Sequence, residues 1–123
     1  MKKLLIAALL ITSTIAFAAD APPVQFKNLK YSFGKIKQGT PVTTTFDFTN
    51  ISSKPVVIEL ATAECGCTTP DYPKTPILKG KSAAIKVTYN AANAGHFEKK
   101  VTVKLANIAE PIVLQIEGDV VEK

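Results

Sequence analysis

The alternation of apolar and polar side chains constrains this sequence more than any other feature. After residue 40, several runs carry an apolar side chain at every second position, as expected for a strand with one buried face. Thr, Val and Ile are frequent in these runs, and branched side chains pack well on a pleated surface. Turn-forming Gly, Pro, Asn and Ser residues separate them. The runs are 42–49, 56–60, 83–90, 97–105 and 112–117.

An apolar cluster before these runs predicts one or two opening strands. Gly34 lies inside it and permits a bulge or bend. Because the apolar face of an alternating strand must be buried, about seven short strands predict an all-β, two-sheet antiparallel sandwich. A small closed barrel is the alternative architecture. The cluster comprises Val24, Phe26, Tyr31, Phe33 and Ile36.

The first 18 residues have the pattern of a secretory signal peptide. Lys2 and Lys3 precede an apolar run, and Ala16-Phe17-Ala18 offers small residues where a signal peptidase reads. The apolar run is too short for a permanent membrane span. We therefore expect cleavage after Ala18, a single domain over residues 19–123, and a periplasmic or extracellular location. The mature chain keeps 13 Lys against 10 acidic residues, a net charge of +3.

The basic residues of this chain do not indicate a nucleic-acid partner. All 15 are Lys, so the forked guanidinium contacts common at phosphates and guanines are absent. The chain has one His and neither a nucleophile elbow nor a phosphate-binding Gly-rich loop. We accordingly expect no enzymatic activity and no cofactor.

Residues 63–76 interrupt the alternation and contain both cysteines, Cys65 and Cys67. Three Pro in seven residues predict a stiff, extended segment that crosses the molecule. An extended Cys-Gly-Cys would separate the two Cβ atoms by about 6–7 Å. A disulfide needs about 3.5–4.5 Å. A local disulfide therefore requires a kink, and Gly66 is the residue that permits one.

Three roles for Cys65 and Cys67 stay open from the sequence. They can be structural, either bridged or as small apolar side chains. They can exchange disulfides or pair with another molecule, which an exported compartment favours. They can also hold a soft metal such as Cu(I) or Zn(II). The metal site is the weakest of the three, because two thiolates and the single His96 fall short of a closed tetrahedral site.

The function that best fits these features is a non-catalytic binding or assembly module of the cell envelope, with an unidentified envelope protein as partner. The alternative is a periplasmic protein that uses its thiols for redox chemistry or for soft-metal handling. A stiff loop costs little entropy to order on binding, so the loop Cys65–Pro76 is the expected contact surface. The contact candidates are Thr68, Pro70, Asp71, Tyr72 and Pro73.

Two further polar features have simple interpretations. Asn50-Ile51-Ser52 matches a glycosylation sequon, which we interpret as a turn signal. His96 follows the turn residues Asn93-Ala94-Gly95 and is expected to be a solvated loop residue.

Several short motifs together resemble the bacterial domain-of-unknown-function family 1573. The most specific is Cys65-Gly66-Cys67-Thr68-Thr69-Pro70. The resemblance implies an immunoglobulin-like sandwich, similar to domains of ciliary and centrosomal proteins and to periplasmic pilus chaperones, in an exported bacterial protein. It implies no activity for the Cys pair. The other motifs are Phe46–Asn50, Pro55–Ile58, Pro76-Ile77, Gly80, Gly95-His96-Phe97 and Ile116-Glu117-Gly118.

Overall fold

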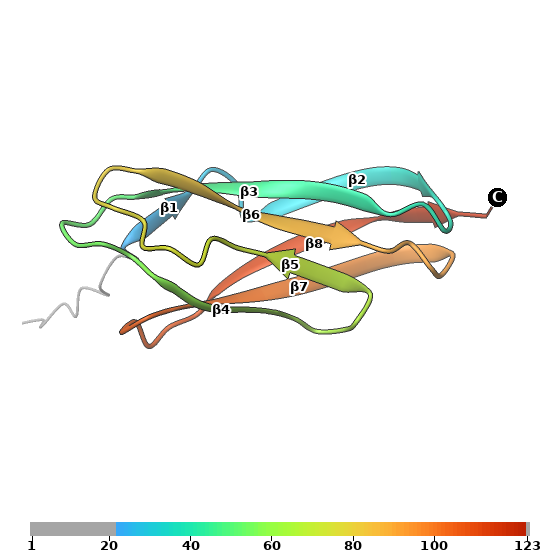
Figure 1. Cartoon of the computed structure of the whole chain (residues 1–123). Coiled ribbons are helices and arrows are strands. Elements are labelled where there is room, and N and C mark those ends of the chain that lie inside the picture. The colour runs from blue at the N-terminus through green and yellow to red at the C-terminus, as the bar shows by residue number, and fades with distance from the viewer. Residues whose placement is uncertain (1–21, 123) are drawn as a thin grey trace, which may run out of the picture.

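The computed structural model describes residues 22–122 and consists of two four-stranded sheets packed face to face (Figure 1). One sheet has the strand order β1-β3-β6-β5 and the other β2-β8-β7-β4. This confirms the predicted two-sheet sandwich and makes the barrel alternative wrong. The expected signal peptide lies outside the described residues. The strands are β1 (Val24–Phe26), β2 (Lys30–Lys37), β3 (Val42–Asn50), β4 (Ile58–Ala63), β5 (Thr68–Asp71), β6 (Ser82–Tyr89), β7 (Gly95–Leu105) and β8 (Ile112–Val121).

The core lies between the sheets and is built from the apolar positions of the alternating runs. Both sheets contribute fully buried side chains, each worth about 1.5–3 kcal/mol when removed from water. Near one end, the rings of Tyr89 and Phe97 stack with centroids 3.9 Å apart. Because these residues belong to different sheets, the stack joins the two layers. The largest fully buried apolar side chains are Phe48, Ile85, Leu105, Leu114, Ile116, Val87, Val101 and Val103.

One strand pair differs from the expected antiparallel arrangement. β2 runs parallel to β8, because the chain leaves the first sheet after β1 and joins the second beside its last strand. The register shifts between Ser32 and Lys35, and Gly34 has φ +68°, which confirms the predicted bulge. Opposite this bulge, a Cβ on Gly118 would lie 2.9 Å from the Gly34 carbonyl oxygen and the Phe97 ring. The close approach explains the glycine at position 118.

Asn50 ends β3 and organises the turn that follows it. Its side chain is fully buried, and its Nδ2 donates to the carbonyls of Lys54 (2.8 Å) and Ile77 (2.9 Å). Its Oδ1 accepts hydrogen bonds from the backbone N–H (2.9 Å) and the hydroxyl (2.7 Å) of Ser52. The interpretation of Asn50-Ile51-Ser52 as a turn is therefore confirmed.

We expect Asn50→Ala to lower the free energy of unfolding by about 2–4 kcal/mol, because it leaves buried polar groups without partners. Chemical denaturation monitored by circular dichroism measures this change. Asn28→Ala, at an exposed position, is the matched control and should change stability by less than about 0.5 kcal/mol. Equal effects of the two substitutions would contradict the role assigned to Asn50.

Candidate functional site: the disulfide crossing

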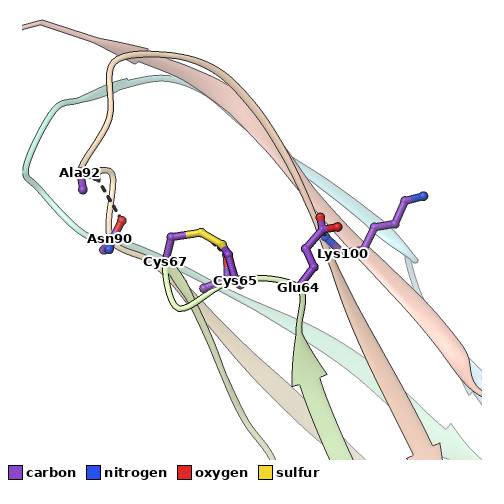
Figure 2. Close-up of a disulfide and its surroundings, with 7 residues drawn as sticks. Glu64, Cys65, Cys67, Asn90, Ala92 and Lys100 are labelled. Atoms are coloured by element: carbon purple, nitrogen blue, oxygen red, sulfur yellow. Dashed lines mark hydrogen bonds between the residues drawn. A yellow bond between two sulfur atoms is a disulfide. The ribbon is translucent and has the colours of Figure 1, made fainter.

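The segment between β4 and β5 carries the chain from one sheet to the other. Within it, Cys65 and Cys67 form a disulfide with their Cα atoms 5.3 Å apart (Figure 2). The crossing lies at the same end of the sandwich as the β2–β3 and β6–β7 connections and the C-terminus (Figure 1). Of the thiol states left open by the sequence, the structure shows the local bridge.

Gly66 does not have the conformational role expected from the sequence. It is exposed, its φ lies outside the left-handed region, and a Cβ added to it would meet nothing within 4 Å. The prediction that the kink depends on the backbone freedom of Gly66 is therefore wrong. The turn that brings the cysteines together uses a conformation open to ordinary residues.

Hydrogen bonds hold the crossing on both sides of the disulfide. On the β4 side, the N–H of Glu64 donates to the Lys100 carbonyl (3.4 Å), and the Glu64 Oε1 accepts from the Lys100 N–H (2.8 Å). On the β5 side, the N–H of Asn90 donates to the Cys67 carbonyl (2.9 Å). Figure 2 shows Glu64 beside Lys100, and the hydrogen bond that the Ala92 N–H donates to the Asn90 Oδ1. The crossing is thus tied to both sheets independently of the sulfur–sulfur bond.

The two sulfurs have different surroundings. Both cysteines are half-buried, but within the described part of the chain Cys67 packs against the hydrophobic core and Cys65 does not. The hydroxyl of Thr68 lies 3.7 Å from the Cys67 Sγ and 4.0 Å from the Cys65 Sγ. Thr68 itself is only 4% exposed. A polar group shielded from water therefore faces the disulfide from its core side.

The two cysteines considered as metal ligands are bonded to each other. Residues 22–122 contain no group of three or more His, Cys, Asp or Glu side chains able to hold a metal ion. His96 lies on β7, not in a loop as expected, and its Nδ1 is 3.0 Å from Asp119 Oδ1 on β8. This exposed side-chain contact was not foreseen, because strand register decides which residue faces His96.

The side chains of the expected contact loop, Cys65–Pro76, differ in their exposure to solvent. Asp71 is exposed and Pro70, Tyr72 and Pro73 are half-buried, whereas Thr68 is buried. The side chain of Thr68 therefore cannot be a surface contact, which corrects that candidate. Pairing of β5 with β6 places Thr68 opposite Tyr89 and turns it toward the core.

The segment after β5 adds a residue that the sequence did not single out. The Nζ of Lys74 lies 3.2 Å from the centroid of the Tyr72 ring, in a cation–π arrangement. The segment ends where Ile77 forms a β-bridge with Val56. We use the name contact segment for residues 70–74, which are held between these two pairings.

Comparison with solved structures defines the class of fold. The match to a PapD-like domain of human CEP192 covers 91% of this chain and 96% of the CEP192 domain, with TM-score 0.69 and 13% identity. A protein of unknown function from Porphyromonas gingivalis W83 covers 89% of this chain and 51% of its own length (TM-score 0.70, 12% identity). The match to the Pseudomonas aeruginosa CupB2 chaperone covers 78% of this chain and 55% of the chaperone chain (TM-score 0.57, 11% identity). These likenesses define a PapD-like, immunoglobulin-like β-sandwich.

Sequence comparison identifies the family within this class. The family model described as "Protein of unknown function (DUF1573)" matches residues 24–120. The chain therefore belongs to the DUF1573 family, as its Cys-Gly-Cys-Thr motif suggested. Curated protein sequences give no match. Within residues 22–122, no helix has the length and apolar character needed to cross a membrane.

We expect Gly66→Ala to leave the free energy of unfolding within about 0.5 kcal/mol of wild type or to raise it slightly, since the new methyl group enters open space. Gly80→Ala is the matched control. Gly80 also has open space around its Cβ position, but its φ is +74°, so we expect a loss of about 1–2 kcal/mol. Thermal unfolding of both variants measures the difference, and equal losses would disprove the conformation assigned to Gly66.

Proposed function

We propose that this protein is an exported, non-catalytic binding or assembly module of the bacterial cell envelope. The partner is an envelope protein that docks on the contact segment. One observation carries the proposal: residues 70–74 present polar and aromatic side chains although the chain is fixed on both sides of them. The PapD-like class supports it, since its members here include a chaperone.

The contact segment is already ordered before any partner binds. Pro70 and Asp71 are in register with Val87 and Lys86 of β6, and the Val56–Ile77 bridge closes the other end. Proline limits the remaining backbone freedom. Association therefore loses little conformational entropy, which is a main cost of forming an interface.

The side chains of this segment indicate the chemistry of the partner. Asp71 offers an exposed carboxylate, Lys74 an exposed ammonium group, and Tyr72 a half-buried ring beneath that ammonium. Aromatic side chains backed by structure are frequent anchors in interfaces, and flanking charges select a complementary surface. We infer that the surface of the partner carries a positive and a negative charge on either side of an apolar depression that accepts the Tyr72 ring.

We expect the double variant Asp71→Asn/Lys74→Gln to lose capture of this partner from envelope extracts, because both charges of the segment disappear. The control Lys54→Gln/Glu110→Gln removes one exposed charge of each sign elsewhere and should retain capture. Affinity isolation on the immobilised mature protein, with quantitative mass spectrometry, measures this. Capture that is equal for the two variants would rule out docking on the contact segment.

Export predicts a mature chain that starts at Ala19. Intact-mass analysis of the protein purified from a bacterial periplasm should give the mass of residues 19–123. Ala18→Arg should leave the leader attached, because the signal peptidase reads small residues at this position. Recovery of the full-length wild-type chain from the cytosol would contradict the envelope assignment.

A further inference from the structure

We propose that the Cys65–Cys67 disulfide is a thiol–disulfide exchange site, whose substrates are the cysteines of a partner protein. The proposal goes beyond the binding role, because it assigns a chemical step to the crossing. It develops the redox alternative that the sequence left open. Three observations support the proposal: the fold around the disulfide is held by other contacts, the two sulfurs have different surroundings, and the chain has no third cysteine.

The bond contributes little that the fold needs. It encloses a ring with a single intervening residue, so it restricts the unfolded chain far less than a long-range disulfide does. The flanking hydrogen bonds between Glu64 and Lys100 and from Asn90 to Cys67 involve no sulfur atom, so they attach the crossing to both sheets without the disulfide. A site that alternates between disulfide and dithiol requires a fold that survives in both states.

The two sulfurs are suited to different roles in the exchange. Both cysteines are half-buried, but Cys67 is the one packed on the core, so we assign the Cys65 Sγ as the atom that an incoming thiolate attacks. Cys67 packs on the core, with the buried Thr68 hydroxyl 3.7 Å from its Sγ. That hydroxyl can donate a hydrogen bond to the thiolate that forms when Cys67 leaves. Thr68 is therefore a positioning residue that stabilises the leaving group.

Because the chain has no third cysteine, the exchange must be intermolecular. A partner thiolate attacks the Cys65 Sγ, a mixed disulfide forms, and the Cys67 thiolate leaves and takes up a proton. A second partner thiolate then attacks the partner sulfur of the mixed disulfide and releases Cys65. The partner loses two electrons and two protons and gains a disulfide, while Cys65 and Cys67 become thiols.

The first experiment follows reduction of the folded mature protein by glutathione, with acid quenching and mass spectrometry. We expect glutathione to appear on Cys65 and not on Cys67 in the mixed disulfide. Thr68→Val should slow reduction by about tenfold, the effect expected from losing one hydrogen bond to a charged sulfur. Thr68→Ser should restore the rate, and Thr69→Val, at the exposed neighbouring position, should leave it unchanged.

The second experiment separates exchange from a structural role. Circular dichroism should show the same β-sheet spectrum before and after reduction, with a melting temperature lowered by about 10 °C or less. Unfolding on reduction would overturn the proposal, and so would a disulfide that excess glutathione leaves intact in the folded protein. Glutathione on Cys67, or equal rates for folded Thr68→Val and Thr69→Val, would overturn the assigned roles. Single Cys65→Ser and Cys67→Ser proteins, each treated with oxidised glutathione, provide an independent check, because only the latter should react rapidly.

Discussion

Burial of two apolar sheet faces against each other is the constraint on which the rest of this structure depends. Each sheet alone would expose a continuous apolar surface to water, so neither is stable without the other. The stacked rings of Tyr89 and Phe97 lie at this interface and join the layers near one end. Because the strands of each sheet are not consecutive in the chain, the backbone must pass from one layer to the other several times.

The β4–β5 crossing is one of these passages, and it carries the Cys65–Cys67 disulfide. Its backbone is attached to β7 on one side and to the end of β6 on the other, so the geometry around Cys65 and Cys67 is set by the sheets. Directly after it, β5 forms a short edge strand that contains Pro70, which limits further pairing. One continuous stretch thus holds the disulfide and an ordered, partly exposed segment on a rigid support.

The strands could be predicted from alternation where one face is apolar and the other polar. β5 was missed, because Thr68 and Thr69 do not alternate in polarity and Pro70 weakens a strand assignment. The direction of β2 was missed for another reason: alternation shows which face is buried but not which way a neighbouring strand runs. At the candidate site, the sequence indicated the cysteines and their crossing. It misassigned Thr68 and Gly66, whose burial and backbone conformation depend on the surrounding strands.

The sequence by itself determined an all-β sandwich, the approximate positions of β3, β4, β6, β7 and β8, and the segment that carries the two cysteines. These properties depend on side-chain polarity along a strand and on proline and glycine chemistry, which act over a few residues. Only the tertiary structure decided that the Thr68 hydroxyl faces the sulfurs, that His96 pairs with Asp119, and that β2 lies parallel to β8. The His96–Asp119 contact depends on the register between β7 and β8, and the burial of Thr68 depends on the pairing of β5 with β6. The direction of β2 depends on the path of the chain from one sheet to the other.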